Sequence, residues 1–234
     1  MCKFEPQNKH SIINSIKMKA QLFLTAVALA AMTACSSNAN KNASTTQAEA
    51  ETANLVENAI KLWSENESVK RMQEAMDTTY APNQMAYYDI DGDGTAELFL
   101  REYIDHQMTG YIAAYTLKNG VKEIALSNNS WQTTWLCVYN NGVVRTDVGS
   151  EGGMDGTTTY FKLKNSELEE IYIHYTAEDE ETGDVDENFQ VATPNSNAGP
   201  ISKDEFNAAL GACVGENAYE NELNINDFKW KDIK

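Results

Sequence analysis

The chain has 234 residues, and its 35 acidic residues outnumber 18 Lys and Arg residues, giving a formal net charge of −17 at pH 7. This balance argues against nucleic acid and against anionic lipid surfaces as partners, because both are polyanions. The length is enough for one domain with its own hydrophobic core, and cations or basic partners are the ligands that the charge favours.

The first recognisable segment runs from Met18 to Cys35 and reads MKAQLFLTAVALAAMTAC. One basic residue, Lys19, precedes an apolar run from Leu22 to Ala31, and small residues stand just before the cysteine. This order is typical of a secretory signal peptide. The apolar run is shorter than the roughly twenty residues that a membrane-spanning helix needs, so we expect it to be cleaved rather than retained.

The end of this segment, Met32-Thr33-Ala34-Cys35, resembles the lipobox of bacterial lipoproteins. The resemblance implies that the thiol of Cys35 receives a diacylglyceryl group and that the chain is cut just before it. We therefore expect residues 1–34 to be a removed leader. The mature protein is expected to be held by this lipid on a membrane of the cell envelope, at the outer membrane or the cell surface. An ordinary signal peptide with a chance cysteine is the alternative.

The residues after Cys35 are small and polar and cannot bury enough apolar surface to fold, so residues 35–50 are predicted to be a flexible tether. Residues 51–234 are predicted to form a single domain of the α+β class. It begins with apolar residues at helical spacing, which indicate one long helix or two short ones before Pro82. These residues are Leu55, Val56, Ala59, Ile60 and Trp63, followed by Val69, Met72 and Met76.

The motif with the most specific chemistry is DIDGDGTAEL, residues 89–98. Calcium takes about six to eight oxygen ligands, which a short loop can supply from alternate positions. Closely spaced carboxylates also repel one another unless a cation lies among them. The alternative is an Asp-Gly turn whose carboxylates face water. We predict a structural calcium site with ligands from Asp89, Asp91, Asp93, Glu97 and the backbone carbonyl of Thr95.

The surroundings of this loop differ from those of an EF-hand, because Leu100 stands where an EF-hand has a bidentate Glu. The flanking residues Met85–Tyr88 and Leu98–Tyr103 have the composition of strands. The loop resembles the strand-flanked calcium loops of integrin-type FG-GAP repeats. The wider segment AYYDIDGDGTAELFL is similar to one in uncharacterised lipoproteins of Bacteroidetes and Firmicutes. That resemblance implies a calcium loop and an exported domain, with no known activity.

After Pro82 the sequence alternates between apolar and polar residues and is rich in β-branched and aromatic ones, which predicts strands. Short turns containing Asn and Gly separate them, and such turns join antiparallel neighbours. The prediction is a central antiparallel meander. Its expected strands are Tyr111–Leu117, Val121–Leu126, Thr133–Tyr139, Val143–Val148, Thr157–Leu163 and Leu168–Tyr175, with turns at Asn119-Gly120, Asn140–Gly142 and Asn165-Ser166.

The rest of the chain predicts an exposed loop followed by a short helix. The acidic run Ala177–Asn188 is predicted to be solvated. Ser202 and Glu205 have the spacing of a capping box. They predict a short C-terminal helix over Lys203–Leu210, with Gly211 as its end.

Two residue pairs keep two interpretations each. On a strand, Trp131 and Trp135 would share one face, which suits a stacking platform for a sugar ring, and aromatic core residues are the alternative. Cys137 and Cys213 would be able to pair in an oxidising compartment, and separate buried side chains are the alternative.

The sequence contains no recognisable motif for nucleophilic, zinc-dependent or phosphate-binding chemistry. We therefore expect a binding or interaction module with a glycan or protein ligand of unknown identity, rather than an enzyme. A secreted, calcium-dependent hydrolase acting on glycans is the alternative, because the carboxylates of glycosidases leave little signature in a sequence.

Overall fold

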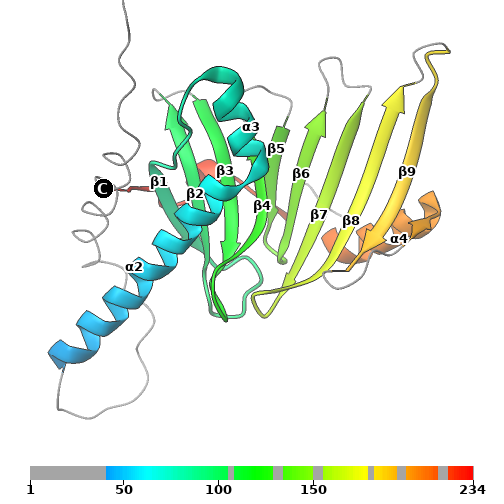
Figure 1. Cartoon of the computed structure of the whole chain (residues 1–234). Helices are drawn as coiled ribbons and strands as arrows, with labels where there is room; N and C mark the ends of the chain where they lie inside the picture. Colours follow the sequence, from blue (N-terminus) through cyan, green and yellow to red (C-terminus); the bar gives the residue numbers. More distant parts are fainter. Residues whose placement is uncertain are drawn as a thin grey trace, which may run out of the picture.

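The computed structural model of the chain describes residues 41–104, 108–128, 134–149, 155–178, 182–193, 199–215 and 221–233. Two helices, α2 (Lys41–Glu65) and α3 (Glu67–Met76), precede a long antiparallel meander, and a third, α4 (Lys203–Val214), follows it (Figure 1). The predicted α+β class, with an N-terminal helix, a central meander and a short C-terminal helix, is confirmed. None of the described helices is long and apolar enough to span a membrane.

The strands form two antiparallel sheets. Sheet A has five strands in the order β12-β1-β2-β3-β4, and sheet B has seven in the order β10-β9-β8-β7-β6-β5-β11. Consecutive strands from β1 to β4 and from β5 to β9 are neighbours, which is the pattern of a meander. The bounds are β1 Gln84–Tyr88, β2 Glu97–Ile104, β3 Met108–Thr116, β4 Lys122–Asn128, β5 Thr134–Tyr139, β6 Val143–Gly149, β7 Gly156–Lys164, β8 Glu167–Glu178, β9 Val185–Ala192, β10 Pro200–Ile201, β11 Glu222–Leu223 and β12 Lys231–Asp232.

The N-terminal helices cover one face of sheet A. The sequence left one helix or two open, and the structure has two, because Asn66 stops α2 and caps α3 through its side chain, which accepts a hydrogen bond from the Ser68 backbone N–H at 2.9 Å. Trp63 of α2 is fully buried and packs against sheet A. Helix α2 begins at Lys41, so it includes the later part of the segment that the sequence predicted to be a tether.

Sheet A contributes to two separate hydrophobic cores because side chains of successive strand residues point to opposite faces. Leu98 and Leu100 pack with Trp63 beneath the helices, whereas Phe99 between them packs on the other face. That second face meets sheet B. Its core combines residues of both sheets with a residue from the C-terminal segment, among them Ala86, Phe99, Ile112, Leu136, Val138, Val144 and Phe228.

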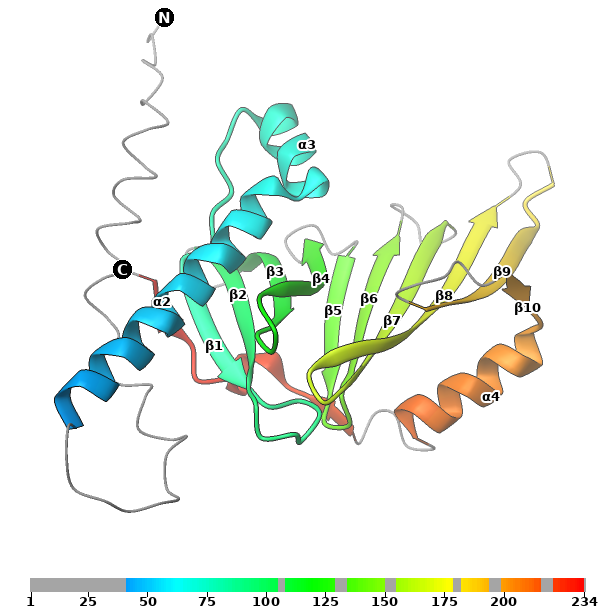
Figure 2. The same cartoon turned by 60° about the horizontal axis from the view of Figure 1, so that its bottom comes forward.

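A third core lies between sheet B and α4, which Figure 2 shows beside strands β8 and β9. The capping box is confirmed, since the Ser202 and Glu205 side chains each accept a hydrogen bond from the other's backbone N–H. The predicted end at Gly211 is wrong, because α4 continues to Val214. A helical Gly costs about 1 kcal/mol relative to Ala, and burial of Cys213 and Val214 in the last turn offsets this cost.

The prediction of a solvated loop over Ala177–Asn188 is wrong at both ends, because Ala177 and Glu178 belong to β8. Val185–Ala192 forms strand β9, which pairs with β8 along its whole length. Asp186 and Glu187 keep their side chains exposed while their backbone enters the ladder. Strand β9 lies between β8 and the two-residue β10, near the edge of sheet B, where a strand needs few apolar residues. Its charged residues therefore made it look like a loop in the sequence.

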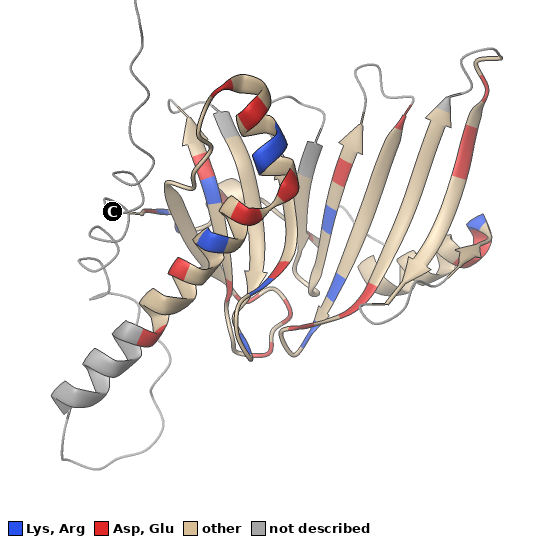
Figure 3. Ribbon diagram, in the orientation of Figure 1, with Lys and Arg blue, Asp and Glu red and all other residues tan. Residues whose placement is uncertain are grey.

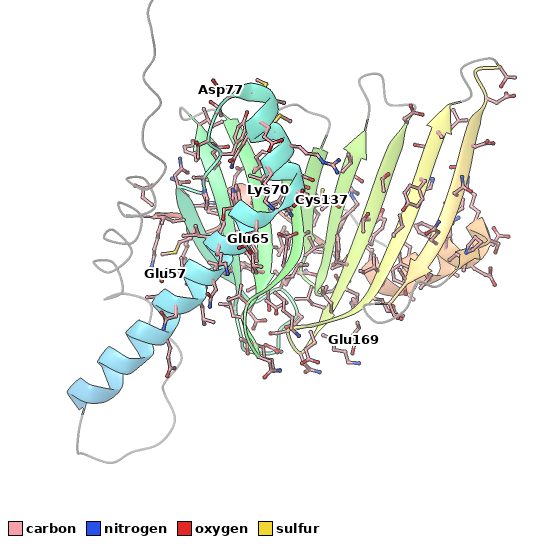
Figure 4. The ribbon with its side chains drawn as sticks, in the orientation of Figure 1. Glu57, Glu65, Lys70, Asp77, Cys137 and Glu169 are labelled. Carbon is pink, nitrogen blue, oxygen red and sulfur yellow. The ribbon has the colours of Figure 1, made fainter. Side chains whose placement is uncertain are left out.

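Acidic residues are spread along the ribbon of both sheets and the N-terminal helices rather than confined to one stretch (Figure 3). Glu57, Glu65 and Lys70 lie along α2 and α3 (Figure 4). The ion pairs on these helices, Lys61 with Glu65 and Lys70 with Glu67, join exposed side chains, and pairs of this kind contribute little to stability.

Candidate metal centre

The loop that the sequence singled out lies between β1 and β2. Its first acid, Asp89, folds the chain back on itself, because Oδ1 accepts a hydrogen bond from the Gly92 backbone N–H at 2.8 Å and Oδ2 accepts one from Gly94 at 2.9 Å. Both glycines have positive φ, +73° and +89°, which L side chains rarely adopt. The loop conformation therefore depends on these glycines and on the Asp89 carboxylate.

The next two acids continue the same pattern at alternate positions. Asp91 Oδ1 accepts from the Asp93 backbone N–H at 3.1 Å, and Asp93 Oδ1 accepts from the Thr95 backbone N–H at 2.7 Å. Each acid therefore uses one oxygen to fix the local turn. The second oxygens of Asp91 and Asp93 point away from the loop and are free to meet groups from elsewhere in the chain.

Those groups come from Ser166, in the turn between β7 and β8. The Ser166 backbone N–H donates to Asp91 Oδ2 at 2.7 Å, and its hydroxyl lies 3.0 Å from Asp93 Oδ2 and 3.1 Å from Glu97 Oε1. Ser166 is 1% exposed and has a φ of +56°. The sequence identified this position only as a turn residue, and its pattern carries no signal of a contact with a loop about seventy residues earlier.

Glu97 begins β2 and is fully buried. Its Oε2 accepts a hydrogen bond from the Ile90 backbone N–H at 3.0 Å. Burial raises the pKa of this carboxyl to about 7; the Ile90 hydrogen bond opposes the shift, and the charges of Asp91 and Asp89 add to it. A hydroxyl has a single proton to donate, so Ser166 can serve Asp93 or Glu97 but not both. A protonated Glu97 supplies the second donor.

The pKa of Asp93 is shifted in the direction opposite to that of Glu97. Burial disfavours its charged form, but hydrogen bonds from the Thr95 backbone, Lys118 and Ser166 outweigh burial and lower its pKa. The Lys118 ammonium lies 3.2 Å from Asp93 Oδ2 and also donates to the Asn165 carbonyl at 2.8 Å. A cationic side chain from the β3–β4 turn therefore reaches both the loop and the turn of sheet B.

The loop is consequently a junction between the two sheets. Gly142, in the β5–β6 turn, approaches it so closely that a Cβ there would lie 2.7 Å from the Leu163 carbonyl oxygen and 2.9 Å from Asp91 Cβ. Asn119 donates to Glu167 Oε1 at 3.1 Å beside the Lys118 contact. The turns that follow β3, β5 and β7 therefore converge on the β1–β2 loop.

Three of the predicted ligands come together. One carboxylate oxygen from each of Asp89, Asp91 and Glu97 lies within 4.8 Å of the others. Calcium–oxygen distances are about 2.3–2.6 Å, so oxygens on opposite sides of one ion are up to about 5 Å apart. The spacing therefore fits calcium, and carboxylate donors suit this hard cation. Asp93 is outside this group of three and is held instead by Lys118 and Ser166.

The other predicted site residues lie apart from this centre. Cys35 and Trp131 are outside the described residues, and Trp135 is on β5. Cys137 and Cys213 are both free thiols. Cys137 is labelled in Figure 4; its sulfur lies 3.4 Å from Nη2 of Arg145 and burial raises its pKa to about 11.

Comparisons with protein families, with curated proteins and with solved structures find no match to this chain. Its site is therefore interpreted from its own geometry.

Proposed function

We propose that this chain is a lipid-anchored protein of the cell envelope that acts as a binding or interaction module, with a structural calcium ion held by Asp89, Asp91 and Glu97. The supporting observation is that Glu97 is fully buried with ligand oxygens of two further carboxylates within 4.8 Å. Buried carboxylates that share a site favour neutralisation, by a proton or by a cation. Calcium would neutralise this group at the pH where Glu97 loses its proton.

The ion would act on the scaffold. Asp91 and Glu97 both contact Ser166 of sheet B, so a cation among them would strengthen the junction between the sheets. Asp93 and the Thr95 carbonyl would complete the oxygen shell, with Asp93 exchanging its Lys118 contact for the ion. Such a site stabilises the folded state by an amount that grows with the logarithm of 1 + [Ca²⁺]/Kd.

Calorimetric titration of the chelator-treated protein tests the calcium assignment. We expect one ion per chain with a Kd of about 10⁻⁴ to 10⁻³ M, as in extracellular modules, and poor substitution by magnesium, which requires stricter octahedral geometry. About 1 mM calcium should then add roughly 0.4 to 1.4 kcal/mol to the free energy of unfolding.

The matched variants are Asp91→Ala and Asp184→Ala. Asp91 belongs to the group of three, whereas Asp184 is an exposed acid before β9. The first substitution should abolish the calcium response and the second should leave it intact. Absence of binding to the parent, or equal binding by Asp91→Ala, would mean that the loop is only a turn.

The lipid anchor rests on the sequence of residues 18–35 and is tested separately. The thiol of Cys35 is the proposed acceptor, so labelled palmitate should enter the parent and be absent from Cys35→Ala. Labelling that survives the substitution would contradict the anchor while leaving the calcium site untouched.

An activity assay distinguishes the proposed binding module from the alternative, a hydrolase acting on glycans. The soluble domain should bind glycans or proteins on an array and leave chromogenic glycosides intact. Turnover of a glycoside by the purified domain would favour the hydrolase.

A further inference from the structure

Arg101 of β2 is a buried charge with few partners. It is 7% exposed and points to the same face of sheet A as Phe99. Arginine is almost never so buried unless it is paired. The chain has acids in large excess, 35 against 18 Lys and Arg residues, so an unpaired buried arginine is unexpected in it.

Two aromatic rings flank the guanidinium. Its central carbon lies 4.0 Å from the centroid of the Trp230 ring and 4.6 Å from that of Tyr103. Both distances are within the range of cation–π contacts. Its Nε donates a hydrogen bond to Gln84 Oε1 at 2.9 Å. The two rings and the Gln84 amide therefore contact the side chain and the Nε edge of the guanidinium. None of these contacts uses the two Nη groups.

Neither Nη group is committed. Within the described residues Arg101 has no ion pair, and the Nε contact with Gln84 is its hydrogen bond. Burial lowers the pKa of the guanidinium, yet arginine stays protonated at neutral pH. Among the described residues, this charged pair of donors has no partner.

The surrounding groups are fixed by contacts of their own. The Gln84 amide donates to Asp232 Oδ1 at 3.0 Å, and the Trp230 indole N–H donates to the Ile225 carbonyl at 2.9 Å. Asn83 exchanges hydrogen bonds with the Tyr103 backbone, both at 2.8 Å. The guanidinium is therefore held in one orientation before any ligand arrives, which reduces the entropic cost of binding.

We propose that Arg101, with the rings of Tyr103 and Trp230, binds the carboxylate group of an organic ligand. A planar guanidinium offers two parallel N–H donors that match a carboxylate in a bidentate contact. The flanking rings suit the carbon skeleton attached to that carboxylate. This site is separate from the calcium loop and does not depend on it.

Sodium acetate is the first probe, added to the folded, ¹⁵N-labelled parent protein. Arg71, Arg101 and Arg145 are the arginines of the sequence, so their Nε–Hε signals can be assigned by substitution. The Arg101 signal should move saturably with a Kd of roughly 1 mM, the range expected for two charge-assisted hydrogen bonds. Arg145, which pairs with Asp147 at 2.9 Å, is the internal control, and sodium chloride controls for ionic strength.

Further arms separate the sources of the effect. In the parent, acetate should also shift the indole N–H signal of Trp230 saturably, because the Trp230 ring lies 4.0 Å from the guanidinium carbon. Arg101→Lys should abolish this shift, because an ammonium lacks the bidentate fork. The parent titration remains a valid test even where this variant folds poorly. Sulfate binding as tightly as acetate would overturn the planar preference. Absence of any response of the Arg101 signal to acetate would overturn the proposal. Equal shifts at Arg71 and Arg101 would also overturn the proposal.

Discussion

Strand β2 carries two buried charged groups that the fold treats in opposite ways. Glu97, at its start, has a hydrogen-bond partner for each carboxylate oxygen, supplied by the Ile90 backbone and by Ser166 of the other sheet. Arg101, further along, has a partner for Nε and leaves both Nη groups uncommitted among the described residues. The bonds of Glu97 link the two sheets, so an ion bound there is expected to act on the scaffold, whereas the Nη groups of Arg101 keep donors for an organic ligand.

The difference follows from the surroundings of the two groups. The β1–β2 loop has donors because glycines and carboxylates turn its backbone N–H groups inward. Arg101 instead lies among aromatic rings, which cover its stem and supply no anionic acceptor. Three substitutions, in order of decreasing expected effect, test how the partners of buried groups near this strand determine stability.

The largest effect is expected from Gly142→Ala at the junction. The residue has a φ of +83°, and a Cβ would meet the Leu163 carbonyl at 2.7 Å and Asp91 Cβ at 2.9 Å. Backbone strain and the clash together should lower the free energy of unfolding by about 2–4 kcal/mol. Chemical denaturation measures this change.

Gly120→Ala is the control for Gly142→Ala. Gly120 also has a positive φ, +100°, but nothing lies within 4 Å of a Cβ there. Its substitution should cost only the backbone strain, about 1 kcal/mol. Equal losses in the two variants would show that the close approach to the calcium loop contributes nothing to stability.

An intermediate effect is expected from Glu102→Gln, which tests a buried carboxyl with an incomplete set of partners. Oε2 of Glu102 is buried and has no hydrogen-bond partner in the part of the chain that the structure describes. Burial raises its pKa from 4.5 to about 7, against a lowering by the Tyr111 backbone hydrogen bond. The folded state therefore keeps a proton that the unfolded chain has lost.

The contribution of Glu102 to stability should consequently be fully present below about pH 4.5 and should be lost as the pH rises through about 7. Glu102→Gln removes this contribution. Between about pH 4.5 and 7 the parent should therefore lose on the order of 1–2 kcal/mol more of its free energy of unfolding than the variant does. Both proteins retain Glu97, whose titration cancels in the comparison. Denaturation curves measured in chelator across this range decide the matter, and parallel pH profiles would contradict the prediction.

The sequence predicted the fold well wherever the determinant was local. Alternation of apolar and polar residues, with Asn- and Gly-containing turns, predicted the meander. The capping box of Ser202 and Glu205 predicted the start of α4. Its errors came where tertiary packing outweighed local preference. Gly211 did not end its helix because the following residues are buried, and acidic side chains hid β9, whose backbone is paired while those side chains stay in water.

The candidate site divides in the same way. Asp89, Asp91 and Glu97 were predicted as ligands from their spacing, and the chain between them is short enough to bring them together. Ser166 and Lys118 were not predicted, because their contacts depend on how the turns of two sheets meet. Arg101 was not predicted either, since an isolated arginine in a strand has no pattern, and its partner Trp230 comes from the other end of the chain.

The smallest effect on stability, and the most informative on mechanism, is expected from Lys118→Gln. Lys118 neutralises Asp93 in the structure, and we propose that calcium takes over this role. The Lys118 side chain is 40% exposed, so losing the pair should change the free energy of unfolding by less than about 1 kcal/mol. Removing a competing cation should raise calcium affinity by up to about fivefold, the factor that corresponds to such an energy.

Lys122→Gln, at an exposed position of β4, controls for the change in net charge. An unchanged or weaker calcium affinity in Lys118→Gln, measured by the same calorimetric titration, would show that the lysine does not compete with the ion and that Asp93 lies outside the calcium shell.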